Sequence, residues 1–334
     1  MVTGKLPGKI RVSIGTAIIL GLTKGKLDAY PTTAYLLTYR NGKCLANCGF
    51  CPQAKGSKGR ADLLSRVVWP TFPTVSVVQG IEEAVKKGLI KRVCIQALNY
   101  PEVFAHLLQI VKEIRSRVKV SISVSCQPLK AFQMEKLAEA GVERIGIALD
   151  AATEEIFEKV KGENAGSPYS WKGHLKALAD AVEIFGENNV TTHLIVGLGE
   201  TEMEMIQAIQ HCVDMGVYPA LFAFTPISGT ALESRRKPGL DSYRRIQLAR
   251  FLIIRKFARY EGMRFDEDGR IIGFGIERQV LEKVIRSGKP FQTSGCPDCN
   301  RPYYNEKPSG PLYNFPKLPA RQEVAMIEKE IFGE

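Results

Sequence analysis

The sequence contains no long hydrophobic run. Among its 334 residues no apolar stretch reaches the roughly 18–20 residues that a membrane-spanning helix needs, and the apolar run at 17–22 is followed by Lys24 and Lys26. The amino terminus also lacks the charged region, apolar core and small-residue cleavage site of a secretory signal. We therefore expect a cytoplasmic protein with no membrane partner.

Acidic residues are fewer than basic ones. The chain has 35 Asp and Glu against 46 Lys and Arg, which gives a formal net charge of +11. Such a charge favours an acidic partner, although a solvated basic surface explains it equally well. The basic residues are spread along the chain, with no arginine-rich arm and no recognised nucleic-acid motif. We expect an acidic carrier protein, and no nucleic acid, as the partner.

Histidine is scarce, and the four histidines show no metal-ligand spacing. His193 falls on an expected strand and could point inward, but a structural histidine is the more ordinary interpretation. Gly197 and Gly199 lack the third glycine of a dinucleotide-binding fingerprint. The pattern therefore excludes a Rossmann-type cofactor site and gives no evidence for histidine-bound metal.

The chain alternates strand and helix patterns. Expected strands cover 34–39, 92–97, 118–125, 144–150, 190–196, 219–224, 263–274 and 290–294, with helices between them from 75–87 to 277–287. Such alternation indicates βαβ units and a parallel sheet. About eight units predict a (β/α)8 TIM-like barrel, complete or nearly complete. We expect an N-terminal extension (1–30), one barrel domain (31–300) and a C-terminal extension (301–334).

Cysteine is the residue type that carries the chemistry. Cys44, Cys48 and Cys51 have the spacing C-x3-C-x2-C directly after the first expected strand, where a barrel builds its active face. Three thiolates in one loop can bind three irons of a cubane cluster, which leaves the fourth iron open. The alternative is a zinc site completed by a ligand from elsewhere in the chain.

The other cysteines also follow the strand pattern, except Cys212, which falls within an expected helix. Cys94 lies in the second expected strand, Cys126 ends the third, and Cys296 and Cys299 follow the last. A C-x2-C pair with a third cysteine from the barrel suits a second iron–sulfur cluster. The alternatives are a zinc knuckle at Cys296 and Cys299, and buried apolar thiols at Cys94 and Cys126.

The cysteine loop resembles the signature of the radical S-adenosylmethionine (SAM) superfamily, and most of all its biotin synthase and lipoyl synthase branch. The resemblance covers roughly residues 34–300. It rests on Cys44 to Gln53, Cys94, Cys126, Leu149-Asp150, Ile195 to Thr201 and Gly229-Thr230.

This resemblance implies that Cys44, Cys48 and Cys51 hold a [4Fe–4S] cluster whose open iron binds SAM. One-electron reduction of SAM would then yield a 5′-deoxyadenosyl radical. The resemblance also implies SAM-binding roles for Phe50, Gln96, Asp150, Gly197 and Glu200. Many superfamily members have Gly-Gly-Glu in the loop at Gln96 to Asn99, and the acidic residue is missing here.

The departures from biotin synthase indicate a different enzyme. Thr191 stands where biotin synthases have a third auxiliary cysteine, and Ala148 replaces their ribose-binding asparagine. The arginine that ligates their second cluster has no clear counterpart in 263–269. The added Cys296 and Cys299 are expected to lie beside the opening cysteine loop once the barrel closes.

This combination resembles one component of the two-component lipoyl synthases. The resemblance implies a sulfurtransferase that inserts sulfur into an octanoyl chain on a lipoyl carrier, from an auxiliary cluster. It also implies a paralogous partner subunit and an electron donor. The alternatives are a biotin-synthase-like enzyme with another small substrate, and a non-catalytic barrel that is held by metal or assembles clusters.

Overall fold

A curved parallel sheet forms the centre of the molecule, which we describe from a computed structural model covering residues 4–332. Within these residues the main sheet has eight strands in the order β10-β9-β8-β7-β6-β2-β1-β5. Six of these strands are parallel, namely β2, β6, β7, β8, β9 and β10. Strand β1 pairs antiparallel with β2 and β5. The strands are β1 Lys9–Val12, β2 Thr33–Thr38, β5 Thr71–Pro73, β6 Arg92–Gln96, β7 Ser121–Cys126, β8 Arg144–Ile147, β9 Val190–Val196 and β10 Val217–Ala223.

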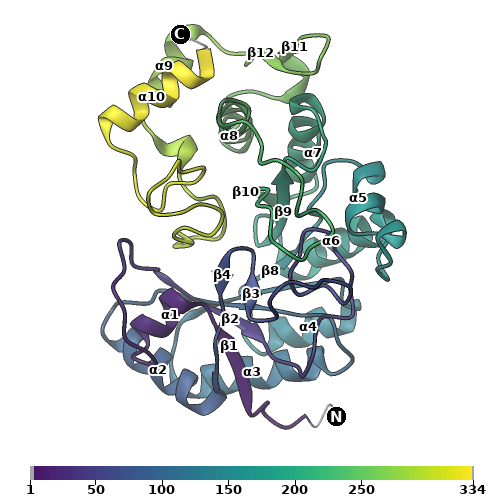
Figure 1. The fold of residues 1–334 in the computed structure, drawn as a ribbon, viewed down its shortest axis with the longest axis vertical. Helices are drawn as coiled ribbons and strands as arrows, with labels where there is room; N and C mark the ends of the chain where they lie inside the picture. The colour runs from purple at the N-terminus through teal and green to yellow at the C-terminus, as the bar shows by residue number, and fades with distance from the viewer. Residues whose placement is uncertain (1–3, 333–334) are drawn as a thin grey trace.

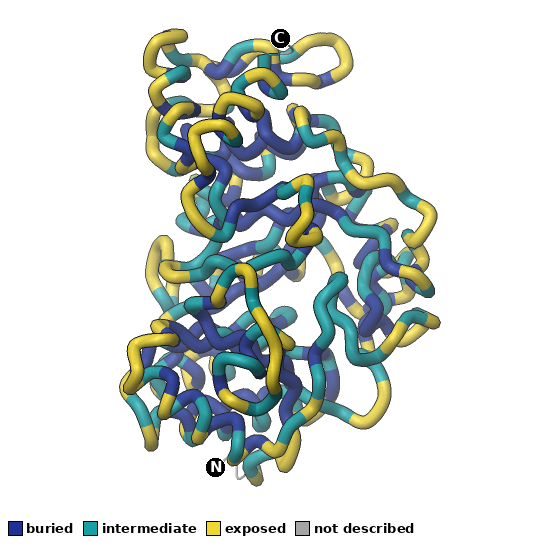
Figure 2. The backbone as a smooth tube through the Cα atoms, turned by 60° about the vertical axis from the view of Figure 1, so that its left-hand side comes forward, coloured by how far each residue is buried: buried dark blue, intermediate teal, exposed yellow. Residues whose placement is uncertain are grey.

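Helices cover the convex side of this sheet and are joined to it by short loops (Figure 1). Their apolar faces pack on the outward side chains of the strands, so strands are buried and loops are exposed (Figure 2). No helix within residues 4–332 is both long and apolar enough to cross a bilayer. The helices are α1 Ile14–Ile19, α2 Thr74–Lys86, α3 Val103–Arg117, α4 Ala131–Glu139, α5 Glu154–Val160, α6 Trp171–Phe185, α7 Glu202–Asp214, α8 Leu240–Ile254, α9 Arg278–Arg286 and α10 Arg321–Phe332.

Strand register decides which side chains share a level inside the sheet. Tyr35 of β2 pairs with Cys94 of β6, which pairs with Ser123 of β7. Two residues further along each strand, Gln96 pairs with Ser125. Because side chains alternate between the two faces of a strand, these residues face the same concave interior. Polar residues thus line the inside of β6 and β7, while Ile122 and Val124 face the helices.

The prediction of a (β/α)8 TIM-like barrel, complete or nearly complete, is confirmed only in its central parallel sheet with alternating strands and helices. The sheet is not closed within the described residues, because the last two expected strands do not join it. Segment 263–274 pairs with itself as the hairpin of β11 (Arg264–Phe265) and β12 (Ile271–Gly273). Segment 290–294 begins in a short 3₁₀ helix at Lys289–Phe291. Pro290 has no N–H to donate to a sheet, which disfavours a strand there.

A segment at 292–304, which we call the closing segment, lies instead across the amino-terminal end of the sheet. The hydroxyls of Thr32 and Thr33 donate to the Asp298 carbonyl at 2.6 and 2.9 Å. On the other side of the opening, the Leu221 N–H of β10 donates to the Ser294 hydroxyl at 2.8 Å. The closing segment therefore connects β2 and β10 without being a strand.

Candidate active site

The three-cysteine loop follows β2 at the carboxyl end of the sheet. Cys44, Cys48 and Cys51 line one cavity of about 170 Å³. The Gly49 N–H donates to the Val160 carbonyl at 2.7 Å, which ties the loop to the end of α5. The Asn99 N–H points at the Cys44 sulfur from 3.1 Å. The loop thus presents all three thiols to one enclosed space.

Burial opposes free thiolates in this loop. It raises the pKa of Cys48 to about 12 and raises that of Cys51 further, where the neighbouring thiols add to the effect. Within residues 4–332 no three His, Cys, Asp or Glu side chains converge as they would around a single metal ion. Three thiols that line one cavity from a single loop fit a cluster, in which each sulfur binds a different iron.

Three of the five residues predicted to bind SAM lie at this cavity, and two do not. Phe50, Gln96 and Asp150 line it with the cysteines. Gly197 and Glu200 lie in the loop after β9, outside the lining residues. There the Glu200 carboxylate accepts the N–H groups of Gly197 and Leu198, at 2.6 and 3.0 Å. Glu200 therefore holds its own loop together in this structure.

A second thiol set lies in a neighbouring cavity of about 420 Å³. Cys94, Cys296 and Cys299 line it, and the Tyr35 hydroxyl lies 3.5 Å from the Cys299 sulfur. Cys126 does not belong to this set, because its side chain lines the first cavity. The structure therefore separates two cysteines that the sequence pattern groups together.

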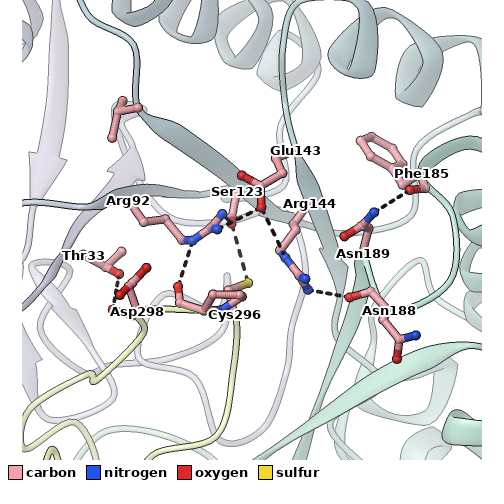
Figure 3. A network of polar contacts seen from close by, with 12 residues as sticks. Thr33, Arg92, Ser123, Glu143, Arg144, Phe185, Asn188, Asn189, Cys296 and Asp298 are labelled. Carbon is pink, nitrogen blue, oxygen red and sulfur yellow. Dashed lines mark hydrogen bonds and ion pairs between the residues drawn. The ribbon is translucent and has the colours of Figure 1, made fainter.

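The cavity of the second thiol set adjoins that of the opening loop, and Cys44, Cys94 and Cys299 all pack against one apolar cluster that includes Tyr35 and Trp69. Figure 3 shows Cys296 at the amino-terminal ends of the strands, beside Arg92, Ser123 and Glu143. The opening loop follows β2 at the opposite, carboxyl end. Cys94 lies at the level of Tyr35, and the three residues of β2 that follow Tyr35 span about 10 Å of extended chain. The closing segment reaches this position because Thr32 and Thr33, at the start of β2, hydrogen-bond to its Asp298 carbonyl.

Arg92 fixes the position of Cys296. Its guanidinium is buried and donates to the Pro297 carbonyl, the Ser123 hydroxyl and the Glu143 carboxylate, each at 2.9 Å. Ser123 in turn donates to the Cys296 sulfur at 3.5 Å (Figure 3). One side chain therefore links β6, β7 and the residue before β8 to the cysteine pair of the closing segment.

Five residues line both cavities and mark the boundary between them: Gln96, Ser125, His193, Phe222 and Tyr304. Burial lowers the pKa of His193 to about 4, so its imidazole is neutral at physiological pH. Within the described chain no hydrogen bond is made by the side chains of Gln96, Ser125 or His193. Three polar side chains are therefore available to a ligand that reaches from one cavity to the other.

Several site residues were not predicted from the sequence. Lys161 pairs with Asp150 at 2.6 Å, and Tyr304 lines both cavities. The guanidinium of Arg301 lies 3.8 Å from the centre of the Phe222 ring in the larger cavity. Arg301 and Tyr304 directly follow the C-x2-C pair, and this closeness in sequence was the available signal. Lys161 had no such signal, because a lysine after a short helix is ordinarily exposed.

Comparison with protein families gives a match over most of the parallel sheet. The model of the radical SAM superfamily matches residues 39–212, more than half of the chain. That range includes the three-cysteine loop, Cys94, Cys126, Asp150 and β9.

Relatives at low identity carry the name biotin synthase. The protein from Synechococcus elongatus is 25% identical over 228 residues, which is 66% of this chain and 67% of that protein. The protein from Hydrogenobaculum is 27% identical over 225 residues, 65% of this chain and 63% of that protein. For the relative from Magnetococcus marinus, the match spans 50% of this chain and 49% of the relative. The chain thus matches about half to two thirds of the length of these relatives.

Solved structures agree on the fold. A methylornithine synthase superimposes with a TM-score of 0.53 at 15% identity, covering 66% of this chain and 61% of that one. An FeFe-hydrogenase maturase from Carboxydothermus hydrogenoformans gives 0.50 at 17% identity, covering 68% and 52%. At such identities the likeness concerns the arrangement of strands and helices.

Proposed function

The chain belongs to the radical SAM superfamily, and we propose that it inserts sulfur into an octanoyl chain on a lipoyl carrier protein, as one component of a two-component lipoyl synthase. The superfamily binds a [4Fe–4S] cluster and SAM. Cys44, Cys48 and Cys51 would hold that cluster here, since they line one cavity from one loop. Phe50, Gln96 and Asp150 would contact SAM, because they line the same cavity.

The second thiol set is the single observation that carries the proposal. Cys94, Cys296 and Cys299 would hold a second iron–sulfur cluster in the adjoining cavity. When bound, the first cluster supplies an electron that converts SAM to the hydrogen-abstracting radical, and the second supplies the sulfur. The residues between the two cavities would hold the reacting carbon within reach of both, since Gln96, His193 and Tyr304 line each of them.

The rest of the proposal concerns partners. The net charge of +11 supports an acidic carrier domain, because opposite charges speed and orient encounter. A paralogous subunit would complete the pair of sulfur insertions, and an external one-electron donor would reduce the first cluster. Both follow from the resemblance to two-component lipoyl synthases.

The test combines metal analysis with an assay. After anaerobic reconstitution we expect about eight irons and eight sulfides per chain, as two cubanes require. Incubation with SAM, a reductant and an octanoyl-lysine peptide, alone and with a paralogous subunit, should give 5′-deoxyadenosine and a sulfur mass gain. The C296A/C299A variant is the control, and it should keep SAM cleavage but lose the mass gain. Absence of both products under both conditions would refute the proposal.

A second candidate is a biotin-synthase-like reaction on another small molecule. The observation that favours it is the set of unpaired polar side chains at Gln96, Ser125 and His193 between the cavities. Such groups suit a substrate with a neutral polar group near its reacting carbon, because a buried donor or acceptor without a partner is costly. 5′-Deoxyadenosine formation with a sulfur mass gain on a polar small molecule, but not on the octanoyl peptide, would support this candidate.

A further inference from the structure

Lys161 is a fully buried lysine that the chemistry described above does not use. It directly follows α5, and none of its surface is exposed. Its ammonium donates to the Ala148 carbonyl and to Oδ2 of Asp150, the latter at 2.6 Å. It also lies 5.8 Å from the centre of the Tyr169 ring. Burying an ammonium costs several kcal/mol unless partners compensate it, so these contacts hold the charge in place.

Lys161 fixes the side-chain carboxylate of Asp150, which the backbone hydrogen bonds of Asp150 do not restrain. The Asp150 N–H donates to the His193 carbonyl at 2.7 Å, and its carbonyl accepts from Ile195 at 2.8 Å. The backbone is therefore tied to β9, in a left-handed conformation with φ of 67°. Lys161 holds Oδ2, whereas Oδ1 makes no hydrogen bond within residues 4–332. One carboxylate oxygen thus remains for a ligand in the cavity that Asp150 shares with the three cysteines.

Lys161 also lies close to the cysteine loop. The residue before it, Val160, accepts the hydrogen bond from Gly49 in the middle of that loop. Cys48 packs in one apolar cluster with Phe157 and Tyr169, and the Lys161 ammonium lies 6.0 and 5.8 Å from the centres of those two rings. Lys161 is therefore a buried cation close both to the ligand-facing carboxylate of Asp150 and to the cysteine loop.

We propose that Lys161 is a positioning residue for the SAM cluster, which orients Asp150 toward SAM and makes the cluster easier to reduce. A fixed positive charge beside a cluster stabilises its reduced form, because net local charge is one of the factors that set the potential. Because Lys161 holds the Asp150 carboxylate in one orientation, the carboxylate loses less conformational freedom when SAM binds. The proposal depends on membership of the superfamily and is independent of the substrate that accepts sulfur.

The experiment measures two properties of the reconstituted protein besides turnover. Lys161→Met keeps the length of the side chain and removes the charge. We expect it to weaken SAM binding about tenfold in equilibrium dialysis, as loss of one well-placed contact does. We also expect the midpoint potential of the first cluster, followed by electron paramagnetic resonance, to become more negative. Lys161→Arg should restore most of the potential because it retains the charge.

Two further variants separate this role from simple packing. Lys159→Met removes an exposed lysine from the same helix, where it pairs with Glu155, and should change neither property. Asp150→Asn should weaken SAM binding but shift the potential in the opposite, positive direction, because it removes a negative charge. If Lys161→Met lowers thermal stability yet leaves SAM affinity and potential unchanged, Lys161 is a structural ion pair and the proposal is wrong.

The Asp150→Asn variant also decides the case in which Lys161→Met fails to hold the cluster. Asp150→Asn leaves the buried lysine in place with an amide oxygen to accept its hydrogen bond. Unchanged SAM affinity together with an unchanged potential in this variant overturns the proposal. The expected pair of changes supports it. Neither outcome depends on sulfur insertion. The proposal for Lys161 can therefore fail while the proposed function stands, and the proposed function can fail while the proposal for Lys161 stands.

Discussion

Cys94 and Cys126 lie on neighbouring strands, yet their thiols line different cavities. Cys94 is inside β6 at the level of Tyr35 and Ser123, whereas Cys126 is the last residue of β7. Their places in the sequence gave equal reason to include either one in a second cluster. The side-chain direction and the level along the strand separate them, and both depend on register, which a single sequence does not determine.

This separation predicts different effects of two otherwise similar substitutions. Cys94→Ala should lower iron from about eight to about four per chain after reconstitution, because a ligand of the second cluster is lost. Cys126→Ala should keep about eight, since its buried thiol acts as a small apolar side chain. Iron and sulfide analysis with absorption spectra provides the measurement. Equal iron loss in both variants would contradict the assignment.

The residues around Asp150 show where prediction from the sequence ended. Asp150 was found because it ends a strand pattern and resembles a ribose-binding position. Lys161 was not found, because the buried ion pair joins residues 11 apart across α5, and such a pair has no sequence signature. His193 was placed correctly on its strand. Its lack of a hydrogen-bond partner in the described chain depends on cavities that form only when β9 and β10 face β6.

The closing segment is the element on which the second cluster depends. Arg92 makes charge-assisted hydrogen bonds to this segment and to β7, and its side chain is 4% exposed. We expect Arg92→Met to lose the iron of the second cluster and keep that of the first. It should also lower the free energy of unfolding by about 1–3 kcal/mol, because the Pro297 carbonyl and the Ser123 hydroxyl lose a charge-assisted donor.

The measurements for Arg92 are iron content and chemical unfolding. Arg92→Lys should retain part of the second cluster, because it keeps the charge but only a single donor group. Arg117→Met is the matched control, since Arg117 makes a partly exposed pair with Glu113 on α3. Two intact clusters in Arg92→Met would show that the cysteine pair is positioned without Arg92.

The tail beyond the closing segment contains a buried carboxyl group that should make its packing sensitive to pH. Burial raises the pKa of Glu306 to about 7, although nearby arginines and the Asn314 N–H oppose the change. A raised pKa means that the folded state favours the protonated carboxyl. The resulting stability is complete below about pH 4.5 and is lost as the pH rises through 7.

Glu306→Gln should therefore stabilise the protein at pH 8 and have little effect at pH 5. The difference is at most about 3 kcal/mol, which corresponds to a shift of about two pKa units. Thermal unfolding between pH 5 and 8 measures it. Glu267→Gln, which changes an exposed residue of the β11–β12 turn, is the control and should not alter the pH dependence. A parallel pH profile in Glu306→Gln would contradict the assignment.

At the level of elements, the sequence predicted the regular part of the fold and missed its closure. The strands at β2, β6, β7, β9 and β10 follow apolar periodicity and were placed within a few residues, as were α2, α3, α4, α6 and α7. Helix α5 was not predicted, and α8 ends seven residues before its predicted end at 261. The last two expected strands failed for a physical reason. Segment 263–274 folds back on itself around a polar turn at 266–270, and Pro290 has no N–H to donate to a sheet. Tertiary contacts place both segments: the Ile271 N–H donates to the Glu202 carboxylate, and the Ser294 hydroxyl accepts from the Leu221 N–H.

Considered as a whole, the molecule places two thiol sets in adjoining cavities on the inner side of one open sheet. These cavities share five lining residues, so a substrate could touch the radical source and the sulfur source together. This arrangement needs no closed barrel. The closing segment supplies the wall that the missing strands would have formed, and it brings two thiols with it.

The net charge gives the prediction that belongs to the whole molecule. If the charge of +11 attracts an acidic carrier, binding should weaken as salt shortens the screening length from about 10 Å at 0.1 M to about 3 Å at 1 M. We expect the dissociation constant for an octanoylated carrier domain to rise at least about tenfold across that range, mainly through slower association. Surface plasmon resonance at several salt concentrations measures both rates.

A neutral octanoyl-lysine peptide is the control for this experiment, because it offers the same acyl chain without the charge of the carrier. Its affinity should depend little on salt, or rise slightly, since apolar burial is strengthened by salting-out anions. If carrier and peptide respond alike, electrostatics does not select the carrier and the basic residues form an ordinary solvated surface. If the affinity for the carrier depends on salt and the affinity for the peptide does not, the electrostatic attraction involves the protein surface of the carrier around the acyl chain.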